Sequence, residues 1–107
     1  MNLDKIFEEI ADGIKEIVKN GAKAFADEAE KDLRAFLKDS EEDLKRYSRM
    51  FADGAISKFE YQFLVKMKAD GAEMLAVSAK GIAKARYKHL LESVRNLIVS
   101  SVMAALP

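Results

Sequence analysis

Apolar residues recur at helical spacing from the beginning of the chain. From Leu3 to Val18 they fall three or four positions apart, and acids and lysines occupy the positions between them. This pattern predicts an amphipathic helix with one face toward a core. A second stripe covers residues 22–37, and Gly21 between the two is a possible helix end, because glycine suits the left-handed cap position. Within the second arm, Ser40 either caps a new helix or lies inside a continuous one.

The clearest break in the helical pattern lies between residues 52 and 60. Gly54 suits the left-handed position that ends a helix. Ser57 and Glu60 form a Ser-x-x-Glu capping box, in which each side chain satisfies the other residue's backbone amide. Ile56, just before the cap, is placed to pack against Tyr61. These three local features predict one helix–turn–helix joint.

From Ser57 the helical pattern continues almost to the end of the chain. Gly71 weakens it, because glycine in a helix costs up to about 1 kcal/mol relative to alanine, and we expect a kink or break between residues 69 and 72. No segment alternates polar and apolar residues as a strand would. The sequence therefore predicts a single all-α domain over residues 1–107, built as an antiparallel helical hairpin centred near residues 53–57.

A run of small residues in the second arm follows the heptad spacing of a helix–helix seam. The gaps between its members alternate between four and three positions, and small side chains allow helix axes to approach closely. We expect this seam to pack against the first arm of the hairpin. Its alanines are Ala69, Ala72, Ala76, Ala79 and Ala83.

A lone hairpin with arms of about 50 residues would be roughly 75 Å long and would leave much apolar surface in water. Either the arms break near Gly21 and Gly71 to give a four-helix bundle, or two hairpins pair into a dimeric bundle. The last stretch of the chain carries no charge after Arg95. We expect its apolar residues to contact another molecule: Leu97, Ile98, Val102, Met103 and Leu106.

Composition and charge refine this picture. The 107 residues include no cysteine, and the only proline is the last residue. The 18 bases and 18 acids balance overall, but residues 1–60 carry 11 bases and 15 acids, whereas residues 61–107 carry 7 bases and 3 acids. The net charge is therefore −4 for residues 1–60 and +4 for residues 61–107. We expect these opposite charges to complement each other across the joint. A neutral chain creates no overall field that would attract nucleic acid.

Candidate chemistry is sparse. His89 is the only histidine, so the Glu-x-x-His pairs of a di-iron bundle are not available. The turn around Gly54 has part of a calcium-loop pattern, but Arg49 stands where the first acidic ligand would be. No nucleophile elbow and no glycine-rich phosphate loop occurs in the sequence. We therefore expect a protein that is not an enzyme and that binds no cofactor or metal.

The sequence thus predicts a non-enzymatic helical bundle that mediates self-association or adaptor contacts, with a homo-oligomer and a protein partner as the expected forms. The alternative is reversible binding of lipid or hydrophobic surfaces through amphipathic helices. We do not expect nucleic acid as a partner, because the basic patch of the second arm can neutralise the acidic first arm. The chain begins without a signal-peptide pattern and lacks the roughly 20 apolar residues of a spanning helix, so we expect a soluble, cytoplasmic protein. The basic patch of the second arm, which can neutralise the acidic first arm, comprises Lys80, Lys84, Arg86, Lys88 and Arg95.

Overall fold

The computed structural model describes residues 2–21, 26–76 and 81–106, and these residues form four α-helices and no strand. They are α1 (Leu3–Gly21), α2 (Ala26–Ala52), α3 (Lys58–Ala76) and α4 (Gly81–Ala105). The predicted all-α fold is confirmed. Of the two arrangements left open by the sequence, the structure has the four-helix bundle within one chain.

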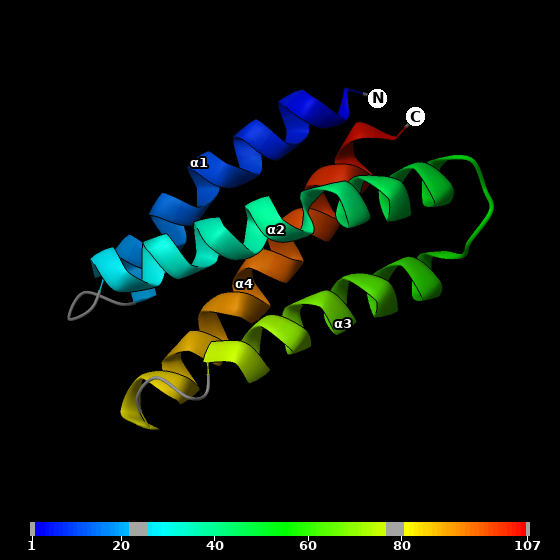
Figure 1. Ribbon diagram of the computed structural model, residues 1–107. Coiled ribbons are helices and arrows are strands. Elements are labelled where there is room, and N and C mark those ends of the chain that lie inside the picture. Colours follow the sequence, from blue (N-terminus) through cyan, green and yellow to red (C-terminus); the bar gives the residue numbers. More distant parts are fainter. Residues whose placement is uncertain (1, 22–25, 77–80, 107) are drawn as a thin grey trace.

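The helices run alternately up and down around a common core (Figure 1). Each helix packs against the next one in the sequence, α4 returns to pack against α1, and α2 also touches α4 across the bundle. The two ends of the chain therefore lie close together at one end of the bundle (Figure 1). The molecule measures 40 × 23 × 19 Å, so its long axis matches the length of the 27-residue helix α2.

The helix boundaries confirm one expected break and correct another. α1 ends at Gly21, as predicted. The expected break between residues 69 and 72 is wrong, because α3 runs through Gly71 to Ala76. Gly71 is exposed, and its cost of up to about 1 kcal/mol in helix propensity is smaller than the gain from burying Tyr61, Val65 and Ala69 on the core face of α3. α2 is likewise continuous through Ser40, which is buried within it.

The end of α2 has the hydrogen bonds of a Schellman motif. Gly54 takes a φ of 77°, the left-handed conformation that its sequence position predicts. The backbone N–H of Gly54 donates to the carbonyl of Phe51 at 3.1 Å, and that of Ala55 donates to the carbonyl of Met50 at 2.9 Å. These bonds satisfy carbonyl groups that the helix end would otherwise leave without partners.

The beginning of α3 has the predicted capping box. The Ser57 amide donates to Glu60 Oε1 at 3.0 Å, and the Glu60 amide donates to Ser57 Oγ at 3.1 Å. These hydrogen bonds lower the pKa of the Glu60 carboxyl, because they favour its charged form. The joint is therefore fixed by local contacts on both sides of the turn.

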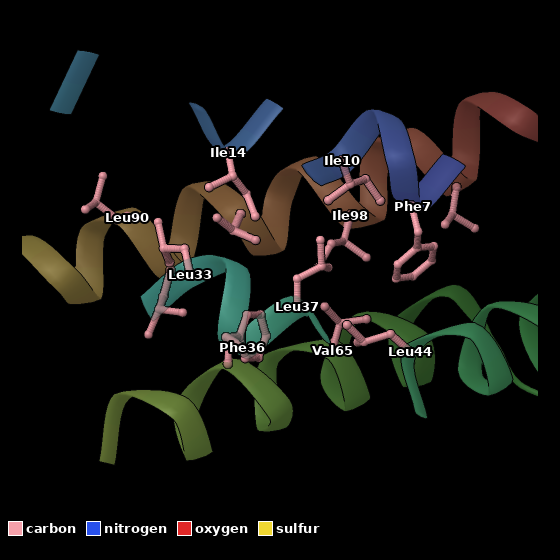
Figure 2. Packing of buried hydrophobic residues seen from close by; sticks show 14 of the residues in the cluster. Phe7, Ile10, Ile14, Leu33, Phe36, Leu37, Leu44, Val65, Leu90 and Ile98 are labelled. Carbon is pink, nitrogen blue, oxygen red and sulfur yellow. The ribbon is translucent and has the colours of Figure 1, made fainter. Parts of the chain in front are cut away.

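Apolar side chains from all four helices form one core, part of which is shown in Figure 2. α1 contributes the stripe predicted from the sequence, and Ile10 and Ile14 are fully buried. α3 contributes a narrower stripe than the other helices, made of Tyr61, Val65 and Ala69. Figure 2 labels Phe7, Ile10, Ile14, Leu33, Phe36, Leu37, Leu44, Val65, Leu90 and Ile98 in this core.

α1 and α4 approach each other closely at a glycine. A Cβ atom added to Gly13 would lie only 2.6 Å from Cδ2 of Leu97. The absence of a side chain at Gly13 thus leaves the space that Leu97 fills. This contact helps to hold the last helix against the first.

Candidate functional site

The apolar C-terminal segment predicted to contact another molecule lies largely inside this chain's own bundle. Ile98 and Val102 are fully buried in the core. Leu97 is partly buried against it, and Met103 and Leu106 are also partly exposed. In this fold, Met103 and Leu106 keep more contact with solvent than Ile98 and Val102, so an external contact of the segment stays a prediction for those two residues.

The alanine run does not follow one continuous helix, because α3 ends at Ala76 and α4 begins at Gly81. A heptad seam needs an unbroken helix, so a single seam over residues 69–83 is wrong. Ala69 is buried, and Ala72 is partly buried against the core. Ala79 lies outside the described residues, as do the side chains of Ala76 and Ala83.

A stripe of large apolar side chains is exposed along the outer face of α3. Phe59 is 75% exposed, Phe63 52% and Met67 55%, and among the described residues these are the exposed large hydrophobic side chains. They are spaced four positions apart, so they lie along one side of the helix. We call Phe59, Phe63 and Met67 the α3 stripe.

The α3 stripe lies on the opposite side of the helix from the residues that enter the core. Each stripe residue precedes a core residue by two positions, as Phe63 precedes Val65. Two positions correspond to about 200° around a helix. α3 therefore has two apolar faces, and the bundle covers only one of them.

A groove of about 660 Å³ runs between α3 and α4 beside the stripe. Phe59 and Phe63 line it from α3, and Val99 and Met103 line it from α4. We call it the α3–α4 groove. The complete lining is Lys58, Phe59, Gln62, Phe63, Lys66, Arg95, Asn96, Val99, Ser100 and Met103.

A second hollow, of about 510 Å³, lies on the other side of α3, against α2. Met67 of the α3 stripe lines it together with Phe36, Tyr47 and Ala72. Phe36 of α2 and Ala72 of α3 thus line the same hollow. Apolar surface is therefore present on both flanks of the α3 stripe.

The charged residues that line the α3–α4 groove are all basic: Lys58, Lys66 and Arg95. Lys66 also donates a hydrogen bond to Asp70 at 2.7 Å, one turn further along α3. The groove thus combines apolar walls with a positive rim.

A buried hydrogen-bond chain anchors α3 to α2. Ser48 Oγ donates to the carbonyl of Leu44 at 2.8 Å and lies 2.9 Å from the hydroxyl of Tyr61. Since the Ser48 proton is used for Leu44, Tyr61 is the donor in the second bond. The Phe51 ring stacks on the Tyr61 ring with centroids 5.0 Å apart, and burial raises the pKa of the Tyr61 phenol. These contacts fix the orientation of α3 and therefore the outward direction of its stripe.

An ion pair joins the same two helices further along. Lys68 of α3 binds Asp43 of α2, and this contact lowers the pKa of the Asp43 carboxyl. Lys45 of α2 makes a corresponding bridge to Asp4 of α1 at 2.6 Å, which lowers the pKa of Asp4. These two ion pairs therefore connect neighbouring helices. The side chains of Lys84 and Arg86, predicted to face the acidic first arm, are not among those described, and Lys80 lies outside the described residues.

The residues considered as catalytic or metal-binding candidates do not form a cluster in the described part of the chain. His89 is on the surface, with Nδ1 3.8 Å from a carboxylate oxygen of Glu92. Across residues 2–21, 26–76 and 81–106, no three metal-ligating side chains come together. Within the same part of the chain, no helix combines the length and the apolar character needed to cross a membrane.

Sequence reasoning missed the exposed α3 stripe, because it treated apolar residues at helical spacing as core residues. A signal was present, since residues 59–69 carry two apolar series offset by two positions. One helix face cannot hold both series.

Comparison of the chain with protein-family models, with curated proteins and with solved structures finds no match.

Proposed function

We propose that this protein is a non-enzymatic assembly or adaptor protein that makes helix-to-helix contacts through the α3 stripe. The exposure of Phe59, Phe63 and Met67 is the observation that carries the proposal. Burial of one such side chain is worth about 1.5–3 kcal/mol. A protein surface that covered all three would gain enough to offset part of the cost of association.

Both flanks of the stripe support a helical contact. The α3–α4 groove and the hollow between α2 and α3 give the convex stripe concave neighbours. Helices pack by fitting rows of side chains into such grooves. A second copy of the chain and a different helical protein are both partners of this kind.

Sedimentation equilibrium over a wide range of concentrations tests the self-association form of the proposal. If a second copy is the partner, the average mass rises with concentration and Phe63→Ser weakens that rise. Lys15→Ser, on the exposed side of α1 away from α3, is the matched control and should change nothing. A monomer mass at every concentration would remove self-association and leave only the adaptor form.

A lipid surface is the second candidate, supported by the positive rim of the groove. Lys58, Lys66 and Arg95 accompany exposed phenylalanine side chains, a combination found in proteins that bind anionic membranes. Flotation with phosphatidylglycerol vesicles tests it. Co-flotation that is lost in Phe63→Ser would support lipid binding, and the absence of co-flotation would contradict it.

A further inference from the structure

We propose that the α3–α4 groove binds an amphipathic helix of a different chain, one whose apolar stripe is flanked by acidic residues. This inference rests on the proposed function, because the groove is part of the surface through which the protein is proposed to make its contacts. It adds the chemistry of the partner and its place on the molecule.

The shape of the groove fits a helix. Its walls are two antiparallel helices, and apolar side chains line it at four-residue intervals, Phe59 and Phe63 on α3 and Val99 and Met103 on α4. A third helix can place a row of side chains between two such rows. Peptide helices that bind in grooves use apolar anchors at positions i, i+3 or i+4, and i+7.

The charges of the groove indicate which residues should stand beside the apolar stripe of the bound helix. Lys58, Lys66 and Arg95 line the groove, and no carboxylate of the described residues does. Lys58 and Lys66 are eight residues apart, which corresponds to about 12 Å along α3. Acidic residues about two turns apart on the bound helix would reach both ends of this interval. Lys66 already binds Asp70 within α3, so a carboxylate of the bound helix would share this lysine, whereas no ion pair of Lys58 or Arg95 is among the described contacts.

A second copy of this chain fits the same groove less well. The α3 stripe is the exposed cluster of large apolar side chains among the described residues, so a symmetric pair would place stripe against stripe. The basic rims of both copies would then face each other, and like charges at an interface disfavour association. A membrane is a flat surface and would leave the walls of the groove uncovered. The observations therefore favour an acidic helix.

The test uses two fluorescently labelled helical peptides and the complete chain. Both peptides carry leucines at positions i, i+3, i+4 and i+7, and one has glutamates on the flanks where the other has lysines. We expect the glutamate peptide to bind at least about tenfold more tightly by fluorescence anisotropy. Added salt should reduce the difference, because it screens exposed charges.

Variants of the protein locate the site. Arg95→Gln should weaken binding of the glutamate peptide about two- to fivefold, the range for one exposed ion pair. Phe63→Ser should weaken it about tenfold or more, because it removes an apolar anchor. Lys15→Gln removes an exposed positive charge on α1 and should leave the affinity unchanged. Circular dichroism of each variant shows whether the bundle is folded.

The outcomes separate this inference from the proposed function. Equal binding of both peptides, weakened in both cases by Phe63→Ser, would overturn the acidic partner and leave the proposed function standing. A chain that binds neither peptide and stays monomeric would overturn both. Dimerisation that blocks the glutamate peptide would assign the groove to a second copy. Binding of phosphatidylglycerol vesicles by a chain that does not bind the glutamate peptide would assign the groove to lipid and overturn the acidic helix.

Discussion

Two glycines show how backbone conformation decides the role of a single residue. Gly54 has a φ of 77° and ends α2, whereas Gly71 lies inside α3 with open space where a side chain would be. A left-handed conformation places an L side chain too close to the following carbonyl, so it strongly favours glycine. Of these two glycines, only Gly54 is required by its backbone conformation.

Replacement of Gly54 by alanine is expected to lower the free energy of unfolding by about 1–2 kcal/mol, since alanine is strained at this φ. Chemical denaturation measures the change. Gly71→Ala is the matched control and should raise the same free energy by about 0.5–1 kcal/mol, because alanine favours the helix. Equal effects of the two substitutions would contradict the assignment of the turn.

Ser48 is the residue on which the buried polar contacts of the bundle depend. Ser48→Ala removes the acceptor of the Tyr61 hydroxyl. A buried hydroxyl without a partner costs about 1–3 kcal/mol, and denaturation should show a loss of this size. Tyr61→Phe should cost less, because Ser48 keeps its bond to Leu44. The double variant should lose less than the sum of the two single losses, and simple additivity would contradict the contact.

The sequence allowed some of these residue roles to be predicted and concealed others. The roles of Gly54, Ser57 and Glu60 depend on neighbours within a few positions, so the local pattern was sufficient. The bond between Ser48 and Tyr61 joins residues of two helices that only the folded bundle brings together. The same is true of the fit of Leu97 against Gly13.

At the scale of the helices, α3 differs from its neighbours because it has two apolar faces. Tyr61 and Val65 enter the core, and Phe59 and Phe63 face outward. Helical spacing identified α3 as a helix but did not indicate which face is buried, because that depends on where α2 and α4 lie. The break at Gly71 was wrong for a related reason, since burial of Tyr61, Val65 and Ala69 outweighs the weak helix propensity of one exposed glycine.

Ion pairs between helices make the stability of the bundle sensitive to acid. The pKa values of Asp4, Asp43 and Glu60 are lower than usual in the folded protein, because Lys45, Lys68 and the Ser57 cap favour their charged forms. As the pH falls below about 4, the unfolded chain takes up protons first, so these contributions to stability are lost. The contributions of these three carboxylates to stability are fully present at neutral pH.

Thermal unfolding followed from pH 7 to pH 3 measures this effect. We expect the midpoint temperature to fall on the acid side. The fall should be smaller in Lys68→Gln, because the pKa of Asp43 then returns toward its usual range. An identical pH dependence in the variant and the original chain would show that the pair between Asp43 and Lys68 does not contribute.

At the scale of the whole molecule, the bundle separates its interior contacts from its outward surface. The C-terminal segment, expected to reach a partner, supplies Ile98 and Val102 to the core. Among the described residues, the exposed large apolar side chains are those of the α3 stripe, and Met103 of the C-terminal segment lines the groove beside it. Composition and periodicity were sufficient to predict a four-helix bundle as one of two arrangements, but the residues left exposed follow from how the helices are placed around the core.

We propose that the α3 stripe is the contact surface of this protein. Sedimentation velocity of the original chain and of Phe63→Ser, each with and without the glutamate peptide, is the decisive measurement. We expect a larger species for the original chain, formed with the peptide or with a second copy, and a monomer for Phe63→Ser under the same conditions. Identical sedimentation of the two proteins in every mixture would contradict it.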